Sequence, residues 1–346
     1  MQVFISPGRG GRLGRGGALY YCKSGPLGMG LKELSVAKFH HGDGRFVNPF
    51  HTNGRRGLWQ VIKWRFFSKS VFEDQYTQQA IRCVYIDWDS IEHYPGLSLT
   101  FINHACVLIK DKDIRFLVDP VFFGLFPTIT NYSPLQWDAG RLPLPDYVLI
   151  THGHYDHLDC RTLKHLGGGP IVVTPLGYRR IFSGLPTRRH IQLDWFEDFA
   201  VNGRHLTLLP CHHWTMRNPF SGPNRSLWGS YLLRTKDGYT IYISGDTAFF
   251  NGFKEIGERF AIDLAIFNLG AYEPRWFMQN SHMNPSETVK AFIYLKAQRL
   301  MIIHWGSFRL GDEPVHWPSL ELASELERVH LADRLVPLVH GETYRC

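Results

Sequence analysis

One stretch of nine residues holds the densest group of side chains able to do chemistry: Thr151-His152-Gly153-His154-Tyr155-Asp156-His157-Leu158-Asp159. It directly follows the apolar residues 147–150, which are predicted to form a buried strand. Burying three imidazoles and a carboxylate within six residues is costly unless a positive group satisfies all of them. Imidazole nitrogens and carboxylate oxygens both bind metals such as zinc. The stretch therefore predicts a metal site at the end of this strand.

The spacing of these side chains indicates two ions rather than one. His152 and His154 are two residues apart and project to the same side of an extended chain, whereas Asp156 and His157 fall in the turn beyond. This arrangement suits a second ion beside the first. Four side chains leave each ion short of ligands, so the hypothesis requires further His or Asp residues at strand ends downstream.

Three later apolar segments end in a residue of ligand type. They are residues 206–209 before His212 and His213, residues 242–244 before Asp246, and residues 300–303 before His304. Each alone is more often structural, because Gly-Asp-Thr is a common turn and a single histidine is readily satisfied by a hydrogen bond. Together with the His-x-His-x-Asp-His cluster they favour a ligand set. His212 and His213 are both candidates, and the pairing of His213 with Trp214 favours His213.

This combination of motifs resembles the metallo-β-lactamase superfamily, and the likeness covers roughly residues 97–310. It implies an α+β fold, a four-layer αβ/βα sandwich of two mixed sheets flanked by helices, with the metals at one rim. It also implies two zinc ions, or iron or manganese in their place. The implied ligands are His152, His154 and His213 for one ion and Asp156, His157 and His304 for the other, with Asp246 bridging.

A narrower likeness points to the branch of N-acylphosphatidylethanolamine-hydrolysing phospholipases D. It rests on residues 43–49, 227–230, 256–260, 270–278, 281–285 and 304–306. These enzymes are zinc phosphodiesterases that release phosphatidic acid and an N-acylethanolamine, and their animal members are membrane-associated dimers. The chain departs from the branch where Ser281 replaces a glutamine and Asn284 replaces an aspartate. The resemblance implies a phospholipid substrate, phospholipase D chemistry and a possible homodimer.

The implied mechanism is attack on phosphorus by a hydroxide held between two ions about 3.5–4 Å apart. Asp156 and Asp246 would be catalytic through the ions, and His282 is a candidate to protonate the leaving oxygen or to bind the phosphate. Asp119, which closes the predicted strand 114–118, is a candidate to hold the second nitrogen of a ligand histidine. The structural alternatives are a rim histidine in a hydrogen bond for His282 and a turn cap for Asp119.

Four aromatic residues are candidates to line an acyl-chain groove near the rim, although aromatic residues make up 14% of the chain and most of them are expected in the core. They are Tyr155, Trp214, Tyr272 and Trp276.

The alternative to a phospholipase, among enzymes, is a lactonase or another hydrolase of the same fold, since activated hydroxide also attacks acyl carbon. An alternative of another class is a non-catalytic, metal-stabilised scaffold that binds lipid or nucleic acid, but such a scaffold does not need seven ligands.

The order of predicted elements favours two sheets packed face to face with helices outside, rather than a doubly wound parallel sheet. Strands are expected at residues 97–109, 114–118, 147–150, 171–173, 206–209, 227–234, 239–243 and 300–303, and helices at about 176–184, 249–260, 286–297 and 318–331. The predicted domains are a disordered leader at 1–38, a basic aromatic arm at 39–96 packed on or near the body, and the hydrolase domain at 97–346.

The charge is concentrated in the first 70 residues, which hold 12 Lys and Arg against two acidic residues, a net charge of +10. The remainder, with 26 basic and 29 acidic residues, carries −3. This distribution fits a peripheral contact with an anionic membrane surface better than a nucleic-acid groove across the body. Within the arm, aromatic residues such as Trp59 and Trp64 alternate with cations, a pattern typical of bilayer interfaces.

The sequence predicts neither a transmembrane helix nor a secretory signal. It contains no run of 18 apolar residues, and residues 1–30, with nine glycines, lack the apolar core of a signal peptide. The six cysteines show no CxxC spacing and are expected to be free thiols in a reducing compartment. We therefore expect a protein on the cytoplasmic side, soluble or peripherally attached to a membrane.

Overall fold

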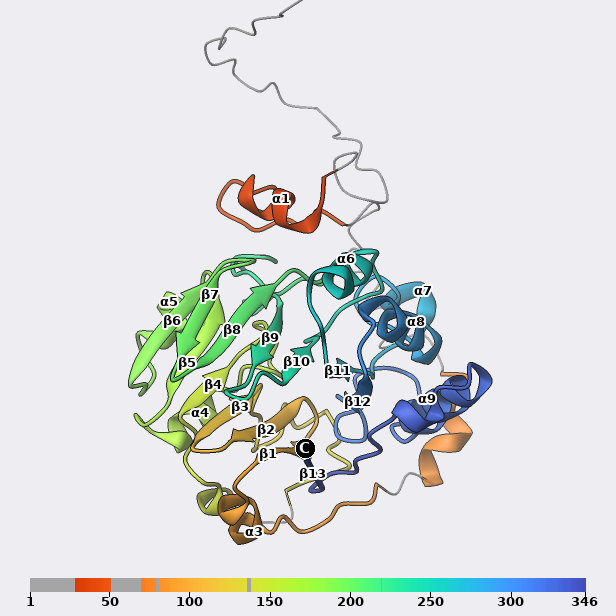
Figure 1. The fold of residues 1–346 in the computed structure, drawn as a ribbon. Coiled ribbons are helices and arrows are strands. Elements are labelled where there is room, and N and C mark those ends of the chain that lie inside the picture. Colours follow the sequence, from red (N-terminus) through yellow and green to blue (C-terminus); the bar gives the residue numbers. More distant parts are fainter. Residues whose placement is uncertain (1–28, 51–69, 79–80, 136–137, 219) are drawn as a thin grey trace, which may run out of the picture.

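Two β-sheets pack face to face in the computed structural model, which describes residues 29–50, 70–78, 81–135, 138–218 and 220–346 (Figure 1). The first sheet has the strand order β13-β1-β2-β3-β4-β5-β6 and the second β12-β11-β10-β9-β8-β7. The first contains β1 (Leu97–Asn103), β2 (Cys106–Asp111), β3 (Ile114–Val118), β4 (Tyr147–Leu149), β5 (Ile171–Pro175), β6 (Arg189–Leu193) and β13 (Thr343–Arg345). The second contains β7 (Asp198–Val201), β8 (Arg204–Leu209), β9 (Ser230–Arg234), β10 (Thr240–Ile243), β11 (Leu264–Asn268) and β12 (Arg299–Ile303).

The strand directions explain why residues far apart in sequence meet at one rim. Strands β1 to β3 are antiparallel neighbours and β3 to β6 are parallel, so β1, β3 and β4 end at the same edge of the first sheet. In the second sheet β7 to β10 are antiparallel and β10 to β12 are parallel, so β8, β10, β11 and β12 share an edge. Loops that follow these strands are thereby gathered together.

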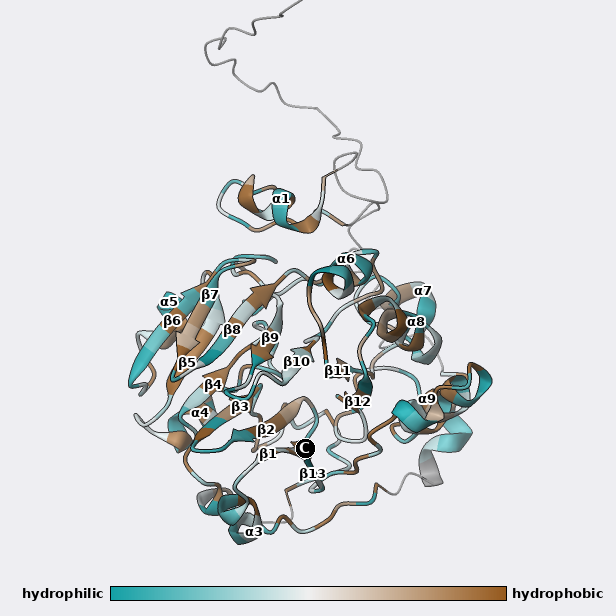
Figure 2. Ribbon diagram, in the orientation of Figure 1, coloured by the Kyte–Doolittle hydropathy of each residue, from teal (hydrophilic) through white to brown (hydrophobic). Residues whose placement is uncertain are grey.

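Helices cover the outer faces of both sheets, which gives four layers. Alternate residues of β2 point to opposite faces: Val107 and Ile109 lie in the core between the sheets, whereas Cys106 and Leu108 pack in a second core with residues of α3 and α4. Helices α3 (Trp88–His93), α4 (Cys160–Leu166) and α5 (Arg179–Phe182) cover the first sheet. Helices α6 (Gly252–Arg259), α8 (Pro285–Leu295) and α9 (Trp317–Arg328) cover the second and show both hydrophilic and hydrophobic residues (Figure 2). The predicted fold class is confirmed.

The start of α8 has the capping box that the sequence indicates. Asn284 Oδ1 accepts the backbone N–H of Glu287 at 2.9 Å, and the Glu287 carboxylate accepts the N–H of Asn284 at 3.1 Å. Arg275, at the start of the short helix α7 (Arg275–Met278), binds the same carboxylate at 2.7 Å and donates to the carbonyl of His282 at 3.0 Å. This network fixes the loop that carries His282.

Several expected elements differ from the observed ones. Residues 97–109 form two strands rather than one, because the chain turns at His104, whose φ of 42° lies in the left-handed region. The expected helix 176–184 contracts to the four residues of α5, and β6, β7, β11, β13, α3, α4 and α7 were not predicted. Short local patterns do not specify these elements, which are stabilised by pairing or packing against distant segments.

The segment predicted to be a disordered leader, residues 1–38, includes an ordered helix. Residues 31–36 form helix α1 (Leu31–Val36), whose Leu31 and Leu34 are buried, so the predicted disorder is wrong for this segment. Carboxylates accept two backbone N–H groups at the start of α1: Glu33 accepts that of the N-cap residue Gly30 at 3.1 Å, and Glu255 on α6 accepts that of Leu31 at 2.7 Å. The rest of the leader before residue 29, and the aromatic residues Trp59, Trp64, Phe66 and Phe67 of the arm, lie outside the described residues.

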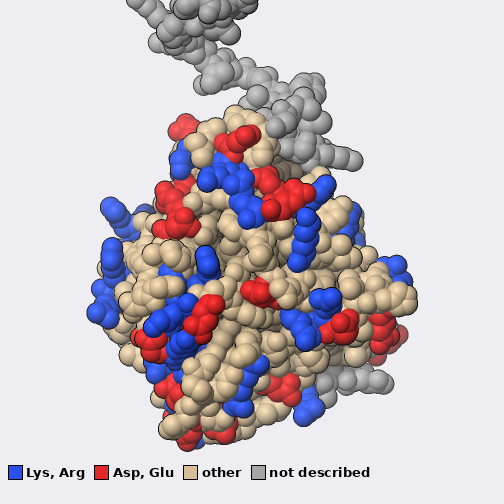
Figure 3. All heavy atoms as spheres, in the orientation of Figure 1, with Lys and Arg blue, Asp and Glu red and all other residues tan. Residues whose placement is uncertain are grey.

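The described surface shows mixed charge. On the face drawn in Figure 3, Lys and Arg side chains alternate with Asp and Glu side chains. Three short 3-10 helices, η2 (Glu73–Gln78), η3 (Ala139–Arg141) and η4 (Ala332–Arg334), complete the helical elements named here. Among the residues that the structure describes, no helix is both long and apolar enough to cross a bilayer.

Candidate metal centre

Eight His and Asp side chains converge where the gathered strand ends of the two sheets meet. The β1–β2 turn supplies His104, the loop after β4 supplies His152, His154, Asp156 and His157, and the segments after β8, β10 and β12 supply His213, Asp246 and His304. All seven ligands expected from the sequence are brought together, and His104 joins them. They form two groups of four, and within each group the potential ligand atoms lie within 4.8 Å of one another.

The first group contains His152, His154, His213 and Asp246. His152 Nε2 lies 2.8 Å from His154 Nδ1, and His213 Nε2 lies 3.3 Å from the same nitrogen. Asp246 Oδ2 lies 3.6 Å from His152 Nε2. His212 is not in this group: its ring lies near Phe50, with ring centroids 6.4 Å apart, and its backbone N–H donates to Thr247 Oγ1 at 3.0 Å. The ambiguity between the two histidines is thus resolved in favour of His213.

The second group contains His104, Asp156, His157 and His304. Asp156 Oδ2 is central to it, at 3.2 Å from His104 Nε2 and 3.4 Å from the Nε2 atoms of both His157 and His304. His104 is the member that sequence reasoning missed. Its only signal is the polar pair Asn103-His104, which interrupts an otherwise apolar run and marks the turn between β1 and β2.

The Asp246 carboxylate lies between the two groups. In addition to its contact with His152, Oδ2 lies 3.3 Å from His157 Nε2, and Oδ1 lies 3.4 Å from His304 Nε2. Asn268, the last residue of β11, donates from Nδ2 to Asp246 Oδ1 at 2.9 Å and orients the carboxylate. Sequence reasoning missed Asn268, since an amide at a strand end carries no ligand signal of its own. The geometry places Asp246 where a bridging ligand belongs.

The donor set fits metal ions. The Nε2 atoms of His157 and His304 are buried and have no hydrogen-bond partner among the described residues, although carboxylate oxygens lie 3.3–3.4 Å away. Buried polar atoms are rarely left in this state. A cation enclosed by these nitrogens and oxygens would satisfy all of them, and imidazole with carboxylate is a typical donor set for zinc and for iron or manganese.

The protonation states favour the same conclusion. Burial lowers the pKa of His104 to about 3 and holds the pKa values of His152 and His213 well below the usual range, so these rings are neutral and keep a lone pair for a metal. Burial alone would raise the pKa values of Asp156 and Asp246, but the neighbouring imidazoles outweigh it and hold both carboxyl groups well below their usual pKa.

The pKa of His157 shifts in the opposite direction from those of His104, His152 and His213. Burial opposes its protonation, but the carboxylates of Asp246, Asp156 and Asp119 outweigh burial and raise the pKa of His157 well above its usual value. The three carboxylates thus create a place that requires positive charge, which a metal ion supplies without a proton.

Comparison with known proteins agrees with this geometry. The family model of the β-lactamase superfamily domain matches residues 114–305, more than half of the chain. The chain belongs to the metallo-β-lactamase superfamily. A possible metal-dependent hydrolase from Veillonella parvula has the same fold, with a TM-score of 0.59 at 18% identity, and the match covers 73% of this chain and 100% of that one. The metallo-β-lactamase fold protein YhfI of Bacillus subtilis matches with a TM-score of 0.54 at 17% identity over 72% of this chain and 99% of its own.

Within the superfamily, the chain falls in the branch of N-acylphosphatidylethanolamine-hydrolysing phospholipases D. It is 33% identical over 257 residues to N-acyl-phosphatidylethanolamine-hydrolyzing phospholipase D 1 from Caenorhabditis elegans. This match covers 69% of this chain and 72% of the relative. It is 30% identical over 227 residues to the mitochondrial protein of that name from Saccharomyces cerevisiae, covering 62% of this chain and about half, 48%, of the relative. The resemblance seen in the sequence is confirmed.

Two residues outside the metal-binding groups position His157 and His304. Asp119 Oδ2 accepts a hydrogen bond from His157 Nδ1 at 2.8 Å, and the same carboxylate accepts the N–H of Thr151 at 2.8 Å and its hydroxyl at 2.6 Å. A carboxylate can only accept, so His157 carries its proton on Nδ1 and presents Nε2 to the cluster. Gly270 packs so closely on His304 that an added Cβ would lie 2.3 Å from the His304 carbonyl oxygen.

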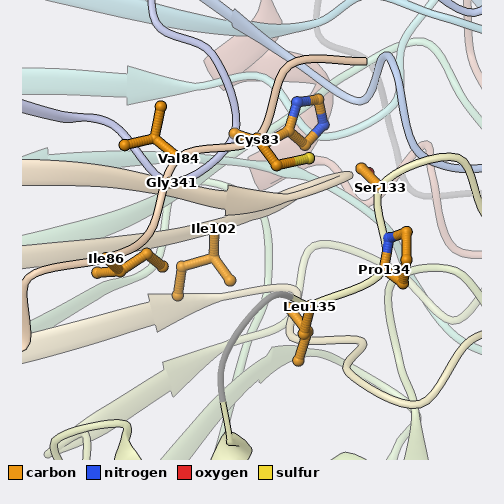
Figure 4. Close-up of a pocket in the computed structure, with 9 residues that line it drawn as sticks. Cys83, Val84, Ile86, Ile102, Ser133, Pro134, Leu135 and Gly341 are labelled. Atoms are coloured by element: carbon orange, nitrogen blue, oxygen red, sulfur yellow. The ribbon is translucent and has the colours of Figure 1, made fainter. Parts of the chain in front are cut away.

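A hydroxyl network supports His104. Its backbone N–H donates to Ser307 Oγ at 2.8 Å, and that hydroxyl contacts Ser133 Oγ at 2.6 Å and His340 Nε2 at 3.1 Å. Beside this network lies a cavity of about 10 Å³, with Cys83, Val84 and Ile86 on one side and Ser133, Pro134 and Leu135 on the other (Figure 4). The cavity has room for about one water molecule and is too small to bind a substrate.

The other residues that the sequence predicted for the site differ in their position relative to the two metal-binding groups. His282 Nδ1 lies 4.0 Å from Asp246 Oδ2, and the Trp214 ring packs edge-on against His154 at 4.8 Å. Tyr155 and Trp276 are 44% and 48% exposed. Tyr272 is not at the metal cluster: it is buried, and its hydroxyl donates to Glu321 on α9. Its expected place in an acyl-chain groove at the rim is therefore wrong.

Proposed function

We propose that this protein is a phosphodiesterase that hydrolyses a phospholipid, of the phospholipase D type, with N-acylphosphatidylethanolamine as substrate and two zinc ions in the cluster. The observation that carries the proposal is the pair of four-residue groups with Asp246 between them and His282 at their edge. The names of the two relatives from Caenorhabditis elegans and Saccharomyces cerevisiae support the choice of substrate.

The residues of the two groups would hold one ion each, with Asp246 touching both. When bound, two ions supply an activated water at neutral pH and offset the charge that grows on the phosphate during the reaction. Asp156 and Asp246 are ionised here and provide the negative charge that retains the ions. Asn268 restricts the rotation of Asp246 and keeps its second oxygen directed between the groups.

His282 is the best-placed residue for contact with the phosphate. Burial lowers the pKa of His282 to about 4, so its ring is neutral at neutral pH and presents one N–H donor. A neutral ring near the ionised Asp246 is suited to donate a hydrogen bond to a phosphate oxygen or to the leaving oxygen. The carbonyl of His282 is held by Arg275, so the ring is positioned by the α7–α8 loop rather than by the metal ligands.

Exposed aromatic side chains near the rim support a lipid rather than a water-soluble substrate. Trp214 is 36% exposed beside His154, and its indole N–H donates to Ser281 Oγ at 3.1 Å. Tyr155 packs edge-on against Phe126, another exposed ring, at 5.2 Å. Apolar surface of this kind around a polar centre is typical of a binding surface. The membrane contact expected of the basic arm, and the homodimer, remain part of the proposal.

The function is tested by a substrate panel given to the purified full-length protein: N-acylphosphatidylethanolamine, an aryl phosphodiester and several lactones. We expect turnover of the first two, with phosphatidic acid and an N-acylethanolamine as the lipid products. Asp156→Asn is expected to abolish turnover with the fold intact by circular dichroism, whereas Asp237→Asn, on the exposed β9–β10 turn, is the control and should be fully active. Turnover of lactones alone would eliminate the lipid substrate.

A further inference from the structure

A second, larger cavity lies away from the metal cluster, between the N-terminus of α8, helix α9, the loop before α7 and the segment around η2. Its volume is about 550 Å³, within the range of small-molecule sites. Six side chains give it its chemical character: Phe72, Tyr272, Trp317, Glu273, Glu321 and Glu325. Tyr272 is the expected site residue that lines this cavity, and the expected mechanism does not use the cavity.

The aromatic side chains offer ring faces to an occupant. The Phe72 and Trp317 rings lie 5.0 Å apart with an interplanar angle of 67°, so their faces are close to perpendicular, and Tyr272 adds a third ring to the lining. The Phe72 and Trp317 rings are in direct edge-to-face contact, and all three rings belong to the lining. The negative faces of aromatic rings attract cations, especially when the cation is partly desolvated.

The charge of the lining has one sign. Three carboxylates face the cavity, and neither Lys nor Arg is among the described residues that line it. Glu325 is paired with Arg328 at 2.6 Å, but Glu273 and Glu321 form no ion pair with a cationic side chain of the described residues. Burial, followed by the carboxylates of Glu313, Glu321 and Glu273, raises the pKa of Tyr272, which agrees with a negative potential in the cavity.

We propose that this cavity binds an organic ammonium ion about the size of choline. Two carboxylates that have no cationic partner among the described residues, beside three aromatic rings, match the chemistry that recognises an alkylammonium group. An anion would be repelled by the carboxylates, and a neutral apolar molecule would bury their negative charge without offsetting it. The site is independent of the phosphodiesterase proposal, because Tyr272 is directed to α9 and not to the metal ligands.

The test compares two ligands of the same shape, choline and its uncharged isostere 3,3-dimethylbutan-1-ol, by saturation-transfer NMR and calorimetry with the metal-loaded full-length protein. We expect choline to bind about tenfold more tightly than the isostere. Glu321→Gln keeps an acceptor for the Tyr272 hydroxyl and should weaken choline binding about tenfold without affecting the isostere. Glu327→Gln is the matched control on the same helix, because Glu327 is exposed and outside the lining; it should bind as the wild type does.

Equal affinities for choline and the isostere, or unchanged choline binding in both Glu321→Gln and Glu273→Gln, would overturn the proposal. Thermal denaturation of each variant guards against a loss caused by misfolding. Phosphocholine distinguishes the possible sources of the ammonium group. If phosphocholine binds as tightly as choline, the ammonium group belongs to a lipid headgroup. If phosphocholine binds more weakly, because the carboxylates repel its phosphate, the occupant is a free amine. Phospholipase activity is not the readout, so this proposal and the proposed function can fail separately.

Discussion

The substitution Asp119→Asn tests whether the groups behind the histidines control metal binding. The Asp119 carboxylate accepts hydrogen bonds from the N–H and the hydroxyl of Thr151 and from His157 Nδ1, at 2.6–2.8 Å. Asparagine has one acceptor oxygen and one NH₂ group. If the oxygen stays with Thr151, the NH₂ meets His157 Nδ1–H, and two donors face each other. His157 then moves its proton to Nε2, the nitrogen that faces Asp156 and Asp246.

We expect this change to weaken metal binding in the group that contains His157 by about 10- to 100-fold, which corresponds to about 1.4 to 2.7 kcal/mol. The group of His152, His154 and His213 should be affected less. The assay is a competition titration of the metal-free protein against a chromophoric chelator, which resolves two equivalents of different affinity.

The control is Asp263→Asn, whose carboxylate accepts the N–H of Thr240 at 2.8 Å, at the end of β10 that is remote from Asp246. Its metal affinities should equal those of the wild type. If Asp119→Asn is folded by thermal denaturation and binds both equivalents with wild-type affinity, the tautomer argument is refuted.

Three further outcomes follow from the structure. Gly270→Ala should lower turnover by about tenfold or more, because the added Cβ collides with the His304 carbonyl, whereas Gly168→Ala, which has open space around its Cβ, should be fully active in the same assay. Arg204→Met leaves the buried Asp111 without its partner at 2.6 Å and should lower the free energy of unfolding in a denaturant titration by about 3–5 kcal/mol, whereas breaking the exposed Lys112–Asp237 pair should cost under about 1 kcal/mol. For Asp194, burial is outweighed by His40 and Lys38, which hold its pKa below the usual range, so the stability lost in Asp194→Asn should be largest above about pH 4 and should shrink as the pH falls toward the folded-state pKa. A difference in unfolding free energy that is the same at every pH would contradict this last expectation.

The metal ligands could be predicted from sequence because their signals are local. The His-x-His-x-Asp-His loop is contiguous, and Asp246 and His304 each follow an apolar strand. Since β10 and β12 run in the same direction as β8, their final residues meet at one edge of the second sheet. The order of predicted elements favoured two sheets packed face to face, and the family resemblance implied that the metals lie at one rim. Strand ends in sequence thus became neighbours in space.

Other parts of the site depend on contacts that no local pattern encodes. His104 enters the cluster because the chain turns between β1 and β2 at a left-handed residue, and the apolar run on both sides hides the turn. Asn268 acts only through its contact with Asp246. Tyr272 follows a strand that ends at the metal rim, yet the loop carries its side chain toward α9. The direction of a loop side chain is set by tertiary packing and cannot be inferred from its distance in sequence to a ligand.

Elemental analysis of protein purified without added metal tests the central claim, that two adjacent His and Asp groups bind two metal ions. We predict two equivalents of a transition metal per chain, with zinc as the main element. Asp246→Asn should reduce the affinity for both equivalents, because its carboxylate touches both groups. A folded wild-type protein that retains less than one equivalent, and gains none on titration with zinc, iron or manganese, would contradict the account.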